Sequence, residues 1–245
     1  MNLLTERCVE LMRELTPVID KALRSTRLYV VPPFLRDDER ASTMPVFVGG
    51  SIVGLLVTDP NVHTLSPTKD IDLVLQVRNR MDFCHVEVAL RQAGFRDVID
   101  EQRTMIGRFT WGPGNETVEF LPPVPEITGF SDQWYSEVLN SAQRTHGVWH
   151  ASAPAYLATK INSFLDGRRG NFASSKDIED ILAVLDGRVG TGSEIENSQP
   201  ELREWLKEKL RYFLGDADFL NALPGHLPDI ARAQRAIGRL REIVA

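Results

Sequence analysis

The sequence predicts an α+β (mixed α/β) fold, in which a small mixed β-sheet is flanked by helices and followed by a C-terminal helical region. Residues Pro45–Val77 indicate, in order, a strand, a glycine turn, a helix, a loop and a second strand. The extended runs Thr104–Trp111 and Glu116–Leu121, joined by the turn sequence Gly112–Asn115, predict a β-hairpin. From Gln133 onward the apolar spacing is helical almost throughout.

Composition excludes several classes of protein. The chain has 245 residues, enough for one large or two small domains, and its net charge of −6 gives no bulk basic character for nucleic acid. This net charge does not exclude a local basic cleft. Cys8 and Cys84 are the only cysteines, too few for a disulfide framework or a cysteine zinc site, and both are expected in the core. Without a charged-then-apolar leader or a membrane-length apolar run, we expect a cytoplasmic protein with no membrane partner.

The front half carries further elements around the sheet. Residues 2–24 repeat apolar side chains at helical spacing and predict an amphipathic helix packed on the sheet, with Pro17 a possible kink or break. Residues 28–31 are expected to be extended or a short strand. Residues 36–42 are expected to be a charged, solvated loop, with contact to a ligand the less favoured alternative. Residues 79–94 predict another helix.

The stiff segment Pro122–Pro125 predicts a boundary between a catalytic core, residues 1–125, and a helical region, residues 126–245. The glycine- and serine-rich segment Gly187–Ser198 predicts a loop. The predicted helices of the rear half are Gln133–Arg144, Pro154–Leu165, Lys176–Leu185, Glu201–Leu214 and Pro228–Ile243.

Two carboxylates open the second strand of the Pro45–Val77 stretch. Alternate side chains of a strand share a face, so Asp70 and Asp72 point the same way while Ile71 points into the core. Like charges held side by side favour a cation between them, and oxygen ligands favour a hard cation such as Mg²⁺. Glu119, on the second hairpin strand, would complete a three-carboxylate cluster if that strand lies beside the first. By itself Glu119 reads as an exposed strand residue.

The glycine turn before these carboxylates is suited to phosphate. Gly49, Gly50 and Ser51 follow a short apolar strand, and Gly50 and Ser51 would open a helix. Free backbone N–H groups and the positive dipole end attract phosphate there, and glycine lets an anion approach the backbone closely. A phosphate-binding turn that faces a metal site is suited to binding a nucleoside triphosphate.

The rear half holds a second concentration of charge. Lys160 sits among apolar residues of one helix, and Ser174, Lys176 and Asp177 precede another, after the basic pair Arg168-Arg169. Two interpretations stay open. Lys160 is a surface lysine and Ser174 with Asp177 forms a capping box, or the basic residues bind triphosphate or RNA backbone while Asp177 orients a lysine.

Together these motifs resemble the nucleotidyltransferase superfamily with a polymerase-β-like fold. Gly-Gly-Ser is followed by Thr68-x-Asp70-Ile71-Asp72 and later by a strand carboxylate. The segments Tyr156–Ile161 and Lys176–Ile181 are similar to AbiEii-type toxin nucleotidyltransferases of abortive-infection and toxin–antitoxin systems. The segment between Ser51 and Asp70 is longer than is usual in that family, so part of it must bulge out or cover the site.

The resemblance implies a Mg²⁺-dependent enzyme that transfers NMP from an NTP to an acceptor hydroxyl, with the tRNA 3′ end as acceptor and a cognate antitoxin as partner. It implies catalytic and metal-binding roles for Asp70, Asp72 and Glu119. The residues that it implies for nucleotide binding are Gly49, Gly50, Ser51, Lys160, Lys176 and Asp177. Modification of a protein or of a small molecule such as an antibiotic, and a non-catalytic nucleotide-binding or partner-binding module, are the alternatives.

Overall fold

The computed structural model describes residues 3–26, 44–59, 68, 70–100, 103–129, 131–167 and 171–245, and these divide into two compact units. The sheet unit comprises the described residues of Leu3–Ile52 and Pro67–Ala151. The helical unit comprises those of Val53–Ser66 and Ser152–Ala245. The predicted boundary at residue 125 therefore differs from the observed division, because residues 143–150 add two strands to the sheet.

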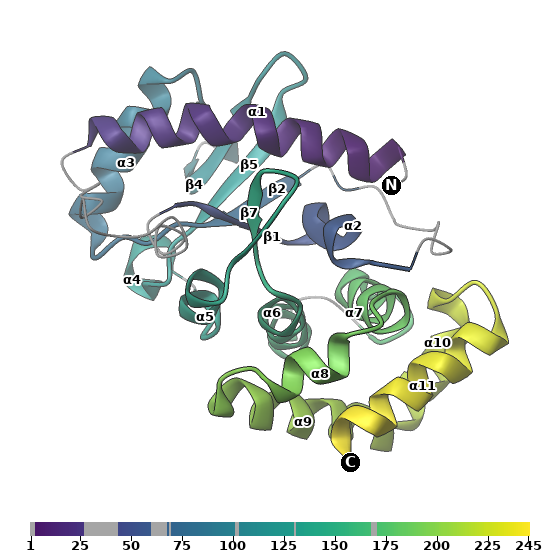
Figure 1. Ribbon diagram of the computed structural model, residues 1–245. Helices are drawn as coiled ribbons and strands as arrows, with labels where there is room; N and C mark the ends of the chain where they lie inside the picture. The colour runs from purple at the N-terminus through teal and green to yellow at the C-terminus, as the bar shows by residue number, and fades with distance from the viewer. Residues whose placement is uncertain are drawn as a thin grey trace. The chain divides into compact units, whose positions relative to one another are not determined.

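The sheet unit is built on a mixed sheet whose described strands run in the order β3-β4-β5-β2-β1-β7-β6 (Figure 1). Two of the pairings are parallel, β2 with β5 and β1 with β7. The other pairings are antiparallel: β1 with β2, β3 with β4, β4 with β5, and β6 with β7. The strands are β1 (Val46–Val48), β2 (Asp70–Val74), β3 (Arg96–Asp100), β4 (Arg103–Trp111), β5 (Glu116–Leu121), β6 (Gln143–Thr145) and β7 (Val148–His150).

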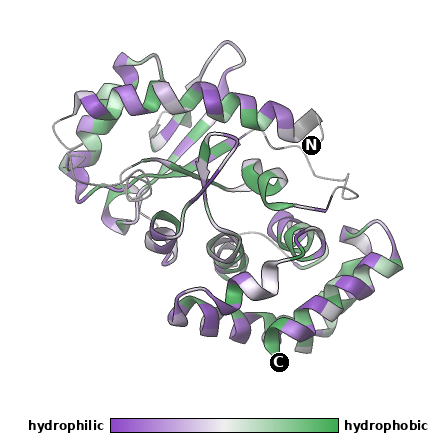
Figure 2. Ribbon diagram, viewed as in Figure 1, coloured by the Kyte–Doolittle hydropathy of each residue, from purple (hydrophilic) through white to green (hydrophobic). Residues whose placement is uncertain are grey.

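Helices of the sheet unit pack against this sheet. Helix α1 (Leu3–Ser25) runs across it, contacting β7 and α3, and hydrophilic and hydrophobic residues alternate along its length (Figure 2). Pro17 lies inside α1 without interrupting it. Below α3 the rings of Phe95, Phe109 and Phe120 stack edge to face in the core. The other helices of this unit are η2 (Gly50–Ile52), α3 (Arg80–Gln92), α4 (Pro125–Thr128) and α5 (Tyr135–Asn140).

The helical unit contains an aromatic cluster made by Phe164, Phe172, Phe213 and Phe219, of which Phe213 and Phe219 are buried. The pair α6 and α7 lies at its centre, and α6, α7 and α8 all contact α9 or α11. Its helices are α2 (Val53–Leu56), α6 (Ala153–Leu165), α7 (Lys176–Gly187), α8 (Thr191–Glu196), α9 (Pro200–Gly215), α10 (Ala217–His226) and α11 (Ile230–Val244).

The predicted fold class is confirmed, and so are the helix near the N-terminus, the hairpin and four of the five rear helices. The helix predicted over Gln133–Arg144 is wrong beyond Asn140. There a tight turn with positive φ at His146 and Gly147 connects β6 to β7, and pairing with β1 outweighs helical propensity. The predicted loop Gly187–Ser198 contains α8, which buries Thr191 and Ile195.

Helix α10, which contains Pro224, was not predicted. Its first turn is nevertheless capped by Asp216, whose carboxylate accepts hydrogen bonds from the N–H groups of Asp218 and Phe219. The segments 28–31 and 36–42, for which an extended run and a charged loop are predicted, lie outside the described residues. Within the described part of the chain, no helix has the length and apolar character needed to cross a membrane.

Candidate active site

The predicted carboxylates lie side by side on one face of the sheet. In β2, Asp70 and Asp72 are half-buried while Ile71 between them is buried on the opposite face. The parallel register pairs Asp72 with Glu119 of β5, so all three acidic residues belong to the same polar face. The sequence could predict the β2 pair from alternation. It could not show that β5 lies next to β2, because that neighbour relation is a parallel pairing between distant segments.

The glycine turn is packed directly against Asp72. Val48, the last residue of β1, pairs with Asp72, and Gly49 follows in the left-handed region with φ +71°. A Cβ atom built at Gly49 would lie 2.0 Å from the Asp72 Oδ2 atom, so only glycine allows this approach. The turn and the acidic face are thus held together by the β1–β2 pairing.

The helical segment that follows the turn is short. Gly50–Ile52 form a single 3₁₀ turn, and α2 adds four residues, so the dipole at this end is small. The Ser51 hydroxyl is buried and donates to the carbonyl oxygen of Val48 at 3.2 Å. The N–H groups at the start of the turn are therefore the donors best suited to a phosphate oxygen.

Arg108 is a member of this site that the sequence analysis missed. On β4 it pairs in register with Glu119, so it shares the polar face with the carboxylates. Its guanidinium reaches across β5, and an Nη atom lies 3.8 Å from Asp70 Oδ2. Alternation along β4 could have revealed it. Phe109 is buried, so the neighbouring Arg108 faces the opposite side of the sheet.

The donor set of this face fits a hard divalent cation in chemistry and register. Asp70, Asp72 and Glu119 offer only oxygen atoms, from adjacent strands and from one face. Their side-chain ends do not yet converge on one point. Among the described residues, no group of three or more acidic, histidine or cysteine side chains lies close enough together to hold a metal ion.

The predicted rear residues form a second, buried ionic cluster within the helical unit. The Lys160 ammonium of α6 lies 3.0 Å from Asp177 Oδ1 and 2.7 Å from Asp180 Oδ2, both on α7. Ser163 donates its hydroxyl to the second oxygen of Asp177 at 3.1 Å. Burial alone would lower the pKa of Lys160, but the carboxylates of Asp180 and Asp177 outweigh it and raise that pKa.

These contacts overturn the surface lysine and the capping box, and they leave the predicted binding of phosphate or RNA untested. Lys160 is not a surface lysine, because its side chain is only 12% exposed. The predicted capping box is also wrong. Ser175, not Ser174, caps α7 by accepting from the N–H of Ile178, and Asp177 turns inward to Lys160. Asp177 therefore pairs with Lys160.

Lys176 is more exposed and lies 3.5 Å from Glu179 and 3.7 Å from Asp180. Arg168 and Arg169 lie outside the described residues. Because Lys160, Lys176 and Asp177 belong to the helical unit and the carboxylate face belongs to the sheet unit, their predicted role at a nucleotide stays a prediction.

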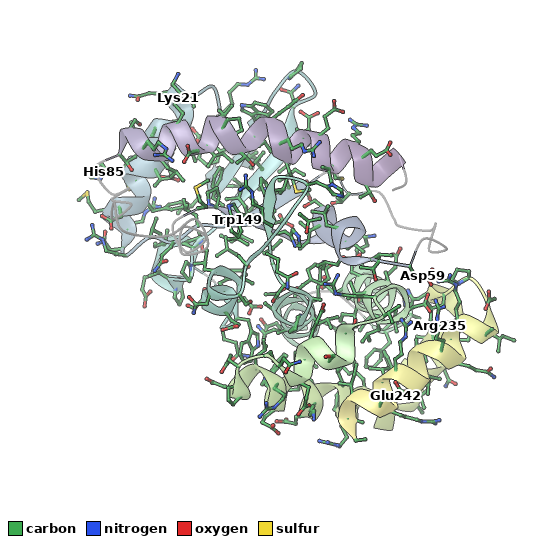
Figure 3. All side chains as sticks on the ribbon, in the orientation of Figure 1. Lys21, Asp59, His85, Trp149, Arg235 and Glu242 are labelled. Carbon is green, nitrogen blue, oxygen red and sulfur yellow. The ribbon has the colours of Figure 1, made fainter. Side chains whose placement is uncertain are left out.

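A third ionic cluster, in the helical unit, was not predicted. Asp186 is almost fully buried and accepts from Arg232 and Arg235 of α11, and Arg235 also lies 3.3 Å from Asp59 (Figure 3). Arg239 donates to the carbonyl oxygen of Asp186 at the C-terminal end of α7. All of these partners are accounted for by protein groups, so we assign the cluster to fixing α11 on α7.

Comparison with known proteins places this geometry beside three solved structures. The sequence matches no protein-family model and no curated protein. An antigenic nucleotidyltransferase-like protein from Paracoccidioides brasiliensis is 22% identical, with 78% of this chain and 84% of that chain covered and a TM-score of 0.40. A putative nucleotidyltransferase from H. pylori is 13% identical, with 94% and 95% covered and a TM-score of 0.43.

The third structure, JHP933 from Helicobacter pylori, is 13% identical, with 94% of this chain and 90% of that chain covered and a TM-score of 0.40. Of these three structures, one is named as a nucleotidyltransferase-like protein and another as a putative nucleotidyltransferase. At such low identities and TM-scores the likeness assigns no activity, so the case for a function rests on the residues of this chain.

Proposed function

We propose that this chain is a Mg²⁺-dependent nucleotidyltransferase that transfers NMP from an NTP to an acceptor hydroxyl. The observation that carries the proposal is the arrangement on one sheet face of Asp70, Asp72 and Glu119, with the Gly49–Ser51 turn packed against Asp72. Carboxylate oxygens beside a glycine turn that opens a helical segment suit a metal-bound triphosphate. We assign the metal to the carboxylates and the phosphates to Gly50 and Ser51.

Each group has a defined task in this proposal. Asp70, Asp72 and Glu119 would hold the divalent ion, which when bound supplies positive charge to the reacting phosphate oxygens. Glu119 is also the carboxylate that could accept the proton of the acceptor hydroxyl, since it lies on the strand next to Asp72. Gly49 keeps the phosphate-binding turn in contact with Asp72, so that binding and catalytic groups stay in register.

The acceptor we propose is an RNA 3′ end such as that of tRNA, with the chain acting as the toxin of a toxin–antitoxin or abortive-infection system. Its support is the resemblance of Tyr156–Ile161 and Lys176–Ile181 to the AbiEii-type toxins, on two helices that pack together as α6 and α7. A non-catalytic nucleotide-binding module is the second candidate. It is favoured by the contact of Asp70 with Arg108 and by the lack of a converged three-donor group among the described residues.

Labelling separates these candidates. The purified protein is incubated with Mg²⁺, each α-labelled NTP and total RNA, beside a variant carrying Asp70→Asn and Asp72→Asn. We expect label in RNA with the wild type, and none with the double variant or with EDTA. Label in protein or in a small molecule would show that this molecule, and not RNA, is the acceptor. Absence of transfer with retained NTP binding would favour the non-catalytic module, and transfer by the double variant would discard the assignment.

A further inference from the structure

Arg108 places a fixed positive charge where the proposed metal site has its negative charges. The register runs directly from Arg108 on β4 to Glu119 on β5 and then to Asp72 on β2. The Arg108 guanidinium crosses β5 diagonally to reach Asp70, two residues before Asp72. It therefore lies over the same sheet face as all three carboxylates.

This arginine is attracted to Asp70 without being firmly bound there. The 3.8 Å separation between Nη and Oδ2 is longer than a hydrogen bond, and the two side chains are 35% and 48% exposed. The Nε atom of Arg108 is buried and has no hydrogen-bond acceptor among the described residues. A bidentate guanidinium–carboxylate pair would satisfy more of these donors, so this pair is one that a stronger ligand can displace.

We propose that Arg108 couples metal binding to nucleotide binding at this face. The inference rests on the proposed function, because it needs the carboxylates to be the metal site. The guanidinium repels a free divalent cation and holds Asp70 in an ion pair, so the empty site binds the bare ion weakly. A metal–triphosphate complex carries net negative charge, so the same guanidinium attracts it and, released from Asp70, pairs with a phosphate oxygen.

The coupling predicts opposite changes in two affinities, one for the free ion and one for the metal–nucleotide complex. Removing the arginine charge is expected to strengthen binding of the free ion by on the order of tenfold, as one unit charge a few ångströms from a half-exposed site commonly does. The same change is expected to weaken binding of the metal–nucleotide complex by a similar factor. A residue with a merely structural role would move both affinities in the same direction.

The experiment measures Mn²⁺ binding by electron paramagnetic resonance, with and without a non-hydrolysable ATP analogue, so that no turnover is needed. The test variant is Arg108→Gln, and Arg108→Lys retains the charge. The matched control is Arg96→Gln on β3 of the same sheet, because Arg96 pairs with Asn115 instead of a carboxylate. We expect Arg108→Gln alone to bind free Mn²⁺ more tightly and the Mn²⁺–nucleotide complex more weakly.

The outcomes distinguish this inference from the proposed function. If Mn²⁺ binding is lost in Asp72→Asn but Arg108→Gln behaves as the wild type, the metal site stands and the coupling is wrong. If Arg96→Gln changes the affinities as much as Arg108→Gln, the effect is one of overall charge and the coupling is again wrong. If the wild type binds no Mn²⁺ with or without nucleotide, both the site and the coupling fail.

Discussion

Two ionic clusters of this protein are built from the same residue types but in opposite ways. On the sheet face, the pair of Asp70 with Arg108 is half-exposed and 3.8 Å apart. In the helical unit, Lys160 is enclosed between Asp177 and Asp180 at 3.0 Å and 2.7 Å, and the two carboxylates are only 2% and 6% exposed. One cluster is open and loosely paired, and the other is closed and tightly paired.

The difference indicates which cluster is available to a ligand. Buried charges must be paired, and a partner removed from such a group leaves an uncompensated charge in low dielectric. The Lys160 cluster therefore holds α6 against α7. Charges on an exposed strand face contribute little to stability, so the carboxylate face can exchange its partners. Substitutions at the two clusters should consequently have opposite effects on stability and on chemistry.

The largest expected effect is on transfer activity. Asp72→Asn keeps the side-chain volume beside Gly49 but removes the charge, and should reduce nucleotide transfer by a factor on the order of a thousand or more. The free energy of unfolding should change by less than about 1 kcal/mol, because Asp72 is half-buried on the polar face. Single-turnover kinetics and urea denaturation measure the two quantities. A large loss of stability would place Asp72 with the structural cluster instead.

The next largest effect is on stability at the closed cluster. Lys160→Met leaves Asp177 and Asp180 buried without their cation and should cost about 3–5 kcal/mol of unfolding free energy. The matched control is Lys176→Met, whose ammonium is 36% exposed and should cost less than about 1 kcal/mol. Urea denaturation of both variants checks this contrast. Equal costs for the two substitutions would contradict the closed character of the Lys160 cluster.

A smaller effect is expected where the turn meets the open cluster. Gly49→Ala adds a methyl group in contact with the Asp72 carboxylate and strains a residue with φ +71°, which should cost about 2–4 kcal/mol. Gly94→Ala is the control, since φ is +96° there but a Cβ would meet no atom within 4 Å. It should lose only the strain contribution, about 1–2 kcal/mol. Similar losses of stability in the two variants would show that the Asp72 side chain moves away from the added methyl group at little cost.

The smallest effect is the pH dependence of the closed cluster. The pKa of Lys160 is raised in the folded protein, because its two carboxylates outweigh the desolvation that lowers it. The stabilisation is therefore fully present below the unfolded value of about 10.4 and is lost as the pH rises through the folded pKa. Unfolding free energy should therefore fall as the pH rises above the unfolded value, more steeply than in Lys160→Met. A parallel pH profile for the two proteins would refute this linkage.

Local sequence signals predicted more of the fold than of the site. The apolar spacing of α1 and α6 and the hairpin of β4 and β5, with its turn at Gly112–Asn115, depend on neighbours in the chain, so they could be predicted directly. The strands β6 and β7 could not, because β7 joins the sheet by pairing with β1, far earlier in the sequence, and β6 pairs with β7. Helix α8 was missed for the same reason, since its buried Ile195 outweighs a polar, glycine-rich composition.

By itself the sequence determined the open cluster in part, because alternation along β2 places Asp70 and Asp72 on one face and a glycine turn follows the preceding strand β1. Only the tertiary structure decided that Glu119 lies opposite Asp72, that Arg108 reaches Asp70 and that Lys160 is buried between two aspartates. The physical reason is that side-chain periodicity is a local property of the backbone. The charge that a residue meets is instead set by strands and helices brought together from distant parts of the chain.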